Sequence, residues 1–221
     1  MVRRISVGPI GQNVYLVESP GSPLVIVDPG AEAERILAEA LAALDRVGLR
    51  RAYIACTHGH LDHVGALGAL AEGLRAAGVE LAVYAPEGDR AYFGAEAEAT
   101  NRRVFQGIHA MGYFHKFWAP VPEPDLYFGD GFELPGTGIA AIHTPGHTRG
   151  SSCFLAEAGS ALISGDTLFE GGRGRTDNFD SDEADIVASI RERLCSLPEA
   201  TRVWPGHGEP TTIGRERPYY R

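Results

Sequence analysis

The hydrophobic positions of the first 48 residues form two short runs with strand character and one longer run with helical spacing. β-branched and other apolar residues cover 13–18 and 24–27, and the turn-rich stretch 19–23 separates them, which predicts a β-hairpin. Apolar side chains then recur every three or four residues over 36–47, and Gly48 ends the pattern. This spacing predicts an amphipathic helix after the hairpin.

The next segment repeats the order of strand and helix, with a polar stretch between them. A strand is predicted over 52–56, the polar cluster 57–63 follows it, and apolar residues at helical spacing run over 64–74 until Gly78. Another strand is predicted over 81–85. Alternating strands and helices indicate an α/β protein in which helices cover a sheet.

The segment 87–135 differs in composition from the rest of the chain, because nine aromatic side chains lie between Tyr92 and Phe128. Its middle, about 95–111, has helical character, whereas three alternate prolines over 120–124 require extended chain. We interpret this segment as an insertion in a single domain that spans 1–221.

Short strands return in the last third, where 139–142, 153–155 and 161–163 each lead into or out of a glycine-rich polar turn. A final helix is predicted over 186–197, and the acidic run 180–183 before it suits a helix N-terminus.

Composition and charge narrow the class of protein. The 221 residues are 44% hydrophobic and 22% charged, which is typical of a folded globular chain, and the formal charge of -9 disfavours binding to nucleic acid. Three cysteines without CxxC spacing give no disulfide framework, and we find neither a signal-peptide core nor an apolar run of membrane-spanning length. We therefore expect a cytoplasmic protein with a small-molecule substrate and without a membrane partner.

The strongest chemical signal is the sequence THGHLDH over 57–63, which places His58, His60, Asp62 and His63 directly after a predicted strand. Neutral imidazole is the commonest metal ligand in proteins, and a carboxylate is a suitable companion. The alternative is a solvated polar loop in which Asp62 caps the next helix. An ordinary cap needs no histidine triplet, so the pattern favours a metal site.

Three further polar residues follow predicted strands in the second half of the chain. His147 lies in HTPGH, Asp166 in SGDT and His207 in PGHG. A single histidine or aspartate in such a turn is more often structural. However, loops that leave strands at one edge of an α/β sandwich converge, and convergence would bring these three side chains to the cluster at 57–63.

In these motifs the sequence resembles the metallo-β-lactamase superfamily, whose signature is HxHxDH followed by a histidine, an aspartate and a last histidine. The resemblance implies an αβ/βα four-layer sandwich with the site along one edge. It also implies that His58, His60 and His147 bind one metal ion, that Asp62, His63 and His207 bind a second, and that Asp166 bridges the two.

The ligand types fit catalysis, because three or four nitrogen and oxygen donors per ion leave a position for water. We expect two divalent ions, zinc first with iron or manganese as alternatives, and a metal-bridging hydroxide as the nucleophile. Asp62 is the candidate catalytic residue, since a carboxylate there can orient the nucleophile or accept its proton. A purely structural role for Asp62 is the alternative.

The sequences around Asp166 and His207, together with GRTD over 174–177, look like the short bacterial glyoxalase II-like hydrolases, which resemble hydroxyacylglutathione thioesterases. The resemblance predicts hydrolysis of a thioester, and it makes Arg175 the candidate anion-binding residue, with a loop-pinning salt bridge as the alternative. The other functions left open are a mono-iron persulfide dioxygenase, a lactonase or other ester hydrolase of the superfamily, and a non-catalytic metal-binding protein.

The aromatic segment 87–135 is the largest departure from the short hydrolase pattern. Our hypothesis is that its side chains, with Tyr113 and Phe117 as substrate-binding residues, form a lid or an apolar wall over the metal ions. The alternative is that they pack in the core or in a homodimer interface.

Overall fold

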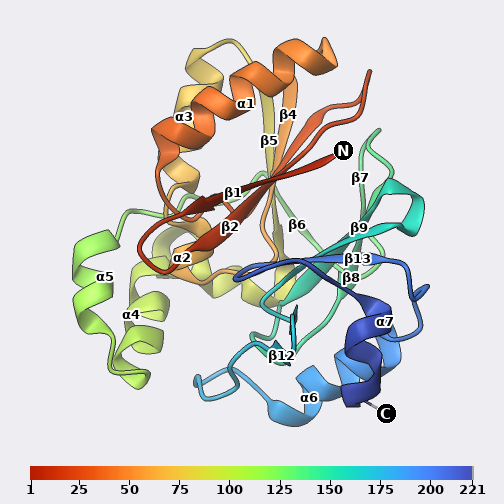
Figure 1. The fold of residues 1–221 in the computed structure, drawn as a ribbon. Helices are drawn as coiled ribbons and strands as arrows, with labels where there is room; N and C mark the ends of the chain where they lie inside the picture. Colours follow the sequence, from red (N-terminus) through yellow and green to blue (C-terminus); the bar gives the residue numbers. More distant parts are fainter. Residues whose placement is uncertain (221) are drawn as a thin grey trace.

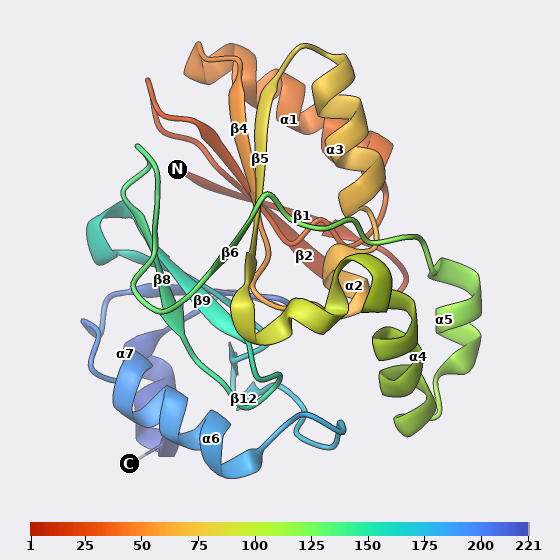
Figure 2. The same ribbon diagram turned by 180° about the vertical axis from the view of Figure 1, so that it is seen from behind.

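The computed structural model describes residues 1–220 and contains two six-stranded sheets that face each other (Figures 1 and 2). In the first sheet the strands follow one another in chain order. The three N-terminal strands pair antiparallel, and the pairing is parallel from β3 to β6. The strands are β1 (Val2–Val7), β2 (Gln12–Val17), β3 (Leu24–Val27), β4 (Arg51–Ala55), β5 (Glu80–Pro86) and β6 (Leu126–Phe128).

The second sheet has the order β14-β13-β10-β9-β8-β7, with β10 and β13 parallel and the other pairs antiparallel. A separate two-stranded hairpin leaves it after β10. The strands are β7 (Glu133–Leu134), β8 (Ile139–His143), β9 (Ser152–Ala156), β10 (Ala161–Gly165), β11 (Leu168–Phe169), β12 (Gly172–Arg173), β13 (Arg202–Pro205) and β14 (Thr211–Thr212).

Helices cover the outer face of each sheet, as Figures 1 and 2 show. The α-helices are α1 (Ala33–Val47), α2 (Leu61–Val64), α3 (Leu67–Ala76), α4 (Ala97–Gly107), α5 (Met111–Phe117), α6 (Glu183–Ala188) and α7 (Ile213–Glu216). A wider helical turn continues α6 over Ser189–Leu194, and 3₁₀ turns cover Glu87–Tyr92, Gly94–Glu96, Glu157–Gly159 and Arg217–Tyr220. None of the helices within residues 1–220 is long and apolar enough to cross a bilayer.

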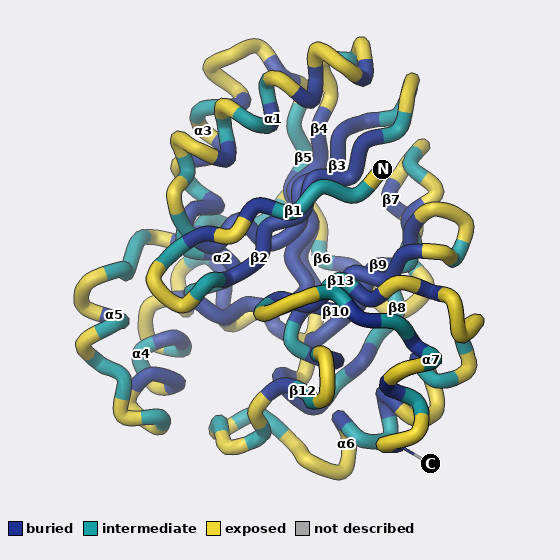
Figure 3. Tube along the Cα trace, in the orientation of Figure 1, coloured by how far each residue is buried: buried dark blue, intermediate teal, exposed yellow. Residues whose placement is uncertain are grey.

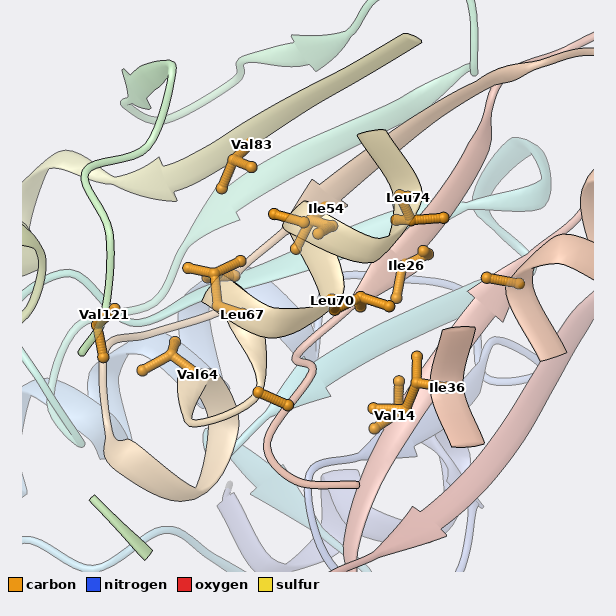
Figure 4. Packing of buried hydrophobic residues seen from close by; sticks show 14 of the residues in the cluster. Val14, Ile26, Ile36, Ile54, Val64, Leu67, Leu70, Leu74, Val83 and Val121 are labelled. Atoms are coloured by element: carbon orange, nitrogen blue, oxygen red, sulfur yellow. The ribbon is translucent and has the colours of Figure 1, made fainter. Parts of the chain in front are cut away.

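The alternation of side chains along each strand explains the four layers. On β3, Ile26 faces α1 and α3 and Val25 faces the second sheet, since successive strand residues point to opposite faces. Figure 4 shows Ile26 and Ile54 packed against Leu70 and Leu74 of α3. Strands β2, β3, β4, β9 and β10 are almost wholly buried (Figure 3). The expected αβ/βα sandwich is confirmed.

The helix expected over 64–74 is interrupted, and the cause is a close approach of backbone. The amide of Ala66 donates a hydrogen bond to the carbonyl of Pro29 at 3.0 Å, and a Cβ on Gly65 would lie 2.7 Å from the carbonyl oxygen of Gly30. The chain therefore leaves α2 to pack against this turn and starts again as α3. Similarly, His109 has a φ of 57° and separates α4 from α5, where one helix over 95–111 was predicted.

Candidate metal centre

The polar side chains of the HxHxDH sequence lie where β4 ends and α2 begins. His58 and His60 are on the connecting loop, and Asp62 and His63 are in the first turn of α2. From the second sheet, His147 follows β8, Asp166 directly follows β10, and His207 follows β13. The structure brings all seven predicted ligand side chains to one edge of the sandwich.

They form two groups. In the first, His58, His60 and His147 each offer a ligand atom within 4.8 Å of the others, and His147 Nε2 lies 2.9 Å from His60 Nδ1. In the second, Asp62, His63 and His207 do the same, and Asp62 Oδ2 lies 3.1 Å from His207 Nε2 and 3.5 Å from His63 Nε2. Each group has the number and type of donors of a catalytic transition-metal site.

Asp166 lies between the two groups. Its Oδ1 is 3.3 Å from His63 Nε2, and its Oδ2 is 3.7 Å from the Nε2 atoms of both His147 and His207. One carboxylate thus faces the nitrogen atoms of both groups. This is the position that a bridging ligand requires.

Unpaired polar atoms show that the residues present fit metal ions. Within residues 1–220, the Nε2 atoms of His58 and His63 and the Oδ1 atom of Asp166 are buried without a hydrogen-bond partner. Buried polar atoms in folded proteins nearly always have a partner, so each such atom needs an explanation. Because these three atoms converge on one place, cations bound there would satisfy them.

Neighbouring groups fix the tautomers of three rings. His63 Nδ1 donates a hydrogen bond to Asp28 Oδ2 at 2.9 Å, and His147 Nδ1 donates to the carbonyl of Arg175 at 2.8 Å. Thr57 Oγ1 donates to Asp28 and therefore accepts from His58 Nδ1 at 3.0 Å. In each ring Nε2 faces the site, and in the neutral form of the ring its lone pair points there, which is how outer contacts orient metal-binding histidines.

Asp28, His58 and His63 form a third set of possible metal ligands, whose donor atoms lie within 4.8 Å of one another. The two oxygen atoms of Asp28, however, accept hydrogen bonds from the amide and the hydroxyl of Thr57 and from His63. Asp28 therefore positions His63 and Thr57 instead of competing as a ligand.

The protonation states at neutral pH suit cation binding. Burial lowers the pKa of His60 to about 3, with the charge of His147 as a further cause, and burial also lowers the pKa of His58. Burial alone would raise the pKa of Asp62, but His63 and His207 outweigh it and lower that pKa to about 2. His58 and His60 are therefore neutral and Asp62 is ionised, as metal ligands must be.

Charged neighbours also shift the pKa values of His63 and Asp166. The carboxylates of Asp166 and Asp62 overcome the effect of burial and raise the pKa of His63 well above its ordinary value. In turn, the charge of His63 overcomes burial and keeps the pKa of Asp166 below its ordinary value. The site therefore already pairs positive with negative charge before any ion is considered, and a cation would replace the proton on His63.

Two glycines allow the loops to come this close. A Cβ on Gly206 would lie 2.2 Å from Asp166 Oδ1, and one on Gly174 would lie 1.9 Å from the carbonyl oxygen of Asp166. These distances are far below van der Waals contact, so any side chain at either position would displace Asp166. Gly206 of PGHG and Gly174 of GRTD are therefore part of the site.

Asp89 is a functional residue that sequence reasoning missed. Its carboxylate accepts hydrogen bonds from the amide of Gly59 at 2.9 Å, the hydroxyl of Thr148 at 2.8 Å and the amide of Gly150 at 2.7 Å. It thus ties the loop that carries His58 and His60 to the loop that carries His147. Burial raises the pKa of Asp89 to about 7, although these hydrogen bonds oppose the shift. A lone aspartate in a turn 30 residues from Gly59 gives no sequence signal of such a contact.

A cavity of about 250 Å³ lies over the ligand side chains. Arg175 lines it, and the guanidinium also forms a two-pronged salt bridge with Asp177, at 2.9 Å and 2.7 Å. Tyr113 and Phe117 line a neighbouring cavity of about 280 Å³ between α5 and the start of α3. Tyr113 stacks on Phe105, which does line the first cavity, at a centroid distance of 5.3 Å.

Comparisons with known proteins agree with this geometry. A sequence model of the family described as the metallo-beta-lactamase superfamily matches residues 7–207. The hydroxyacylglutathione hydrolase GloC of Haemophilus influenzae is 33% identical over 215 residues, covering 93% of this chain and 90% of that protein. The probable metallo-hydrolase YqgX of Bacillus subtilis is 32% identical over 216 residues, covering 97% and 93%.

Two solved structures are similar over nearly their whole length. The B3 metallo-beta-lactamase BLEG-1 superposes with a TM-score of 0.80 at 31% identity and covers 100% of this chain and 99% of its own. The protein TTHA1623 in a di-iron-bound form superposes with a TM-score of 0.77 at 35% identity, covering 97% and 96%.

Proposed function

Because the chain belongs to the metallo-beta-lactamase superfamily and is a metallo-hydrolase by its relatives and its site, we propose that it hydrolyses a thioester at a centre of two metal ions. The observation that carries the proposal is the division of the seven ligand side chains into two groups, with Asp166 facing both. A site for one ion would use only one of these two groups as ligands.

The donor set assigns the ligands. His58, His60 and His147 would hold one ion, Asp62, His63 and His207 the other, and Asp166 would contact both. When bound, divalent ions at such a site polarise a carbonyl group and lower the pKa of water from 15.7 to about 7. Nitrogen and carboxylate donors accept zinc, iron or manganese, and zinc is our first choice.

Asp62 is the residue of the chain best placed to handle a proton. All its contacts with His63 and His207 are made through Oδ2, and within residues 1–220 Oδ1 has no hydrogen-bond partner. The side chain lines the cavity and is 15% exposed. Oδ1 is therefore free to orient the attacking water and to accept its proton, while Oδ2 holds the ligand position.

The cavity lining supports a thioester over an ester or an amide. Apart from the ligand side chains, Arg175 is the only titratable residue that lines the cavity within residues 1–220. Alkoxide and amide leaving groups are strong bases and need an acid to protonate them. A thiol has a pKa of about 8.5 and leaves as a thiolate without that help. The relationship to GloC, which is named a hydroxyacylglutathione hydrolase, supports the same substrate class.

A mono-iron persulfide dioxygenase would need one facial triad of two histidines and one carboxylate. The presence of Asp62, His63 and His207 as a second set argues against that reaction here. Elemental analysis of freshly purified protein, combined with thioester, lactone and persulfide assays, tests the proposal. We expect about two metal ions per chain and thioester hydrolysis. One iron per chain with oxygen consumption on a persulfide would overturn it.

A further inference from the structure

The cavity over the ligands has one apolar wall that the hydrolytic reaction does not use. Val104, Phe105 and Ile108 at the C-terminal end of α4 form most of it, and Ile10 and Phe169 extend it. We propose that this wall binds an uncharged, apolar arm of the substrate, and that Asn178 binds a polar group on the same arm. The proposal rests on thioester hydrolysis and names the class of thioester.

One part of the wall is already packed against the protein, and another part is exposed at the mouth of the cavity. Phe105 is 6% exposed and lies parallel to the ring of Tyr113, which supports it from behind. Ile10, in contrast, is 50% exposed at the tip of the turn between β1 and β2. An aliphatic side chain that reaches from a turn tip into the mouth of a cavity gains from burial only when something apolar covers it.

The charges at the mouth disfavour an anionic arm. Arg175 is the only lysine or arginine that lines this cavity within the described residues, and Asp177 occupies two of its donor atoms, Nε and Nη2. A substrate carboxylate would share the Arg175 guanidinium with the Asp177 carboxylate, which lies beside the same donor groups. An uncharged arm does not meet this repulsion.

Within residues 1–220, Asn178 and Arg175 are the only side chains in the lining, apart from the ligand side chains, that have hydrogen-bonding groups, and Asn178 is the uncharged one of the two. Its Oδ1 atom is buried and has no partner, whereas its backbone is fixed by hydrogen bonds with Ser181. The loop is held further by a hydrogen bond from Tyr92 to Asp180 and by Arg103 over the ring of Phe179. A polar group on the substrate would satisfy the unpaired amide.

The volume of the cavity limits the length of the apolar arm that it can enclose. About 250 Å³ is below the usual range of roughly 300–1,000 Å³ for pockets that enclose a drug-sized ligand. A chain of a few methylene groups fills the wall, and longer chains extend into solvent. Each buried methylene should therefore raise kcat/KM about fourfold until the wall is covered.

The test uses the metal-loaded protein and neutral thioesters of N-acetylcysteamine with acyl groups from acetyl to octanoyl. A second series keeps the acetyl group and lengthens the thiol, which identifies the side of the scissile bond that carries the arm. We expect kcat/KM to rise about fourfold per methylene in one series and then level off. Flat profiles in both series, or a higher kcat/KM for S-lactoylglutathione than for every neutral thioester, would overturn the proposal.

Binding of a stable thioether, S-hexyl-N-acetylcysteamine, separates this proposal from the proposed function. Calorimetry should show that it binds the metal-loaded protein at least tenfold more tightly than the S-methyl analogue. If the thioethers show this difference but no thioester is hydrolysed, the reaction class is wrong and the apolar site stands. If thioesters are hydrolysed but the two thioethers bind equally, the apolar site is wrong.

Two variants assign the effect to the residues. Ile10→Ser should weaken binding of the hexyl thioether about tenfold, whereas Leu126→Ser, which alters a similarly exposed side chain at the start of β6, should not change it. Asn178→Ala should weaken binding of the hexyl thioether about fivefold through loss of the hydrogen bond to its amide. Equal affinities in the wild type, Ile10→Ser and Asn178→Ala proteins would contradict the assignment.

Discussion

The Oδ2 atom of Asp28 accepts a hydrogen bond from His63 Nδ1 at 2.9 Å, although the two residues lie on different elements and 35 positions apart. This contact fixes the ring of His63 so that Nε2 faces Asp62 and Asp166. Asp28 also accepts two hydrogen bonds from Thr57. One carboxylate therefore orients both the start of the metal-binding loop and a ligand of the second group.

Asp28→Asn should weaken metal binding about 10- to 100-fold, because a carboxamide cannot accept hydrogen bonds at both ends. Competition with a fluorescent chelator measures the affinity. Asp45→Asn is the matched control, since the Asp45 side chain is 68% exposed and distant from the site, and its affinity should equal that of the wild type. An unchanged affinity in Asp28→Asn would show that His63 is held in place by other contacts.

Asp62→Asn should lower kcat about 10²- to 10⁴-fold and change KM little, because the carboxamide keeps an oxygen ligand but cannot accept a proton. Steady-state kinetics and elemental analysis of the same preparation measure the two effects. If the variant instead loses one metal ion per chain together with its activity, Asp62 has a purely structural role.

Gly206→Ala should reduce both the metal content and the activity, because its Cβ would lie 2.2 Å from Asp166 Oδ1 and force that carboxylate out of position. Gly129→Ala adds a methyl group where no atom lies within 4 Å, and it should leave both quantities unchanged. Equal metal content in the two variants would mean that Asp166 is not needed between the two groups.

Asp89 should make stability depend on pH. Its pKa is raised to about 7 in the folded protein, so its contribution to the free energy of unfolding is largest below the unfolded pKa of about 3.9 and falls as pH rises to about 7. The stability advantage of the wild type over Asp89→Asn, measured by urea unfolding in excess chelator, should therefore shrink between pH 5 and pH 8. A constant or growing advantage would contradict the raised pKa.

Asp177→Asn should release Arg175 from its salt bridge and raise kcat/KM for S-lactoylglutathione about threefold. Neutral thioesters should show no change, and they serve as the internal control. A decrease for the anionic substrate would indicate that the salt bridge holds the loop in its active position and that Arg175 does not need to be freed.

Short-range patterns predicted strands covered by helices, and the resemblance of the motifs to the metallo-β-lactamase superfamily implied the four layers and the set of candidate ligands. Periodicity defined the helix over 36–47 and the strands around it, and the spacing of THGHLDH gave four of the seven ligands. The edge strand β1 was missed, since its half-exposed residues, among them two arginines, lack a clear alternation.

These short-range patterns could not predict contacts between distant segments of the chain. The role of Asp89 depends on three loops meeting, and the position of Tyr113 and Phe117 depends on the break that His109 introduces between α4 and α5. The aromatic segment was expected to face the site through those two residues. In the structure its contribution to the cavity comes from the apolar end of α4.

A crystal structure of the metal-loaded protein, with data collected at the absorption edge of the bound metal, would locate the ions themselves. We expect two anomalous peaks about 3.5–4 Å apart, one among His58, His60 and His147, the other among Asp62, His63 and His207, with Asp166 in contact with both. A single peak in a fully loaded crystal, or a second peak away from these residues, would contradict this expectation.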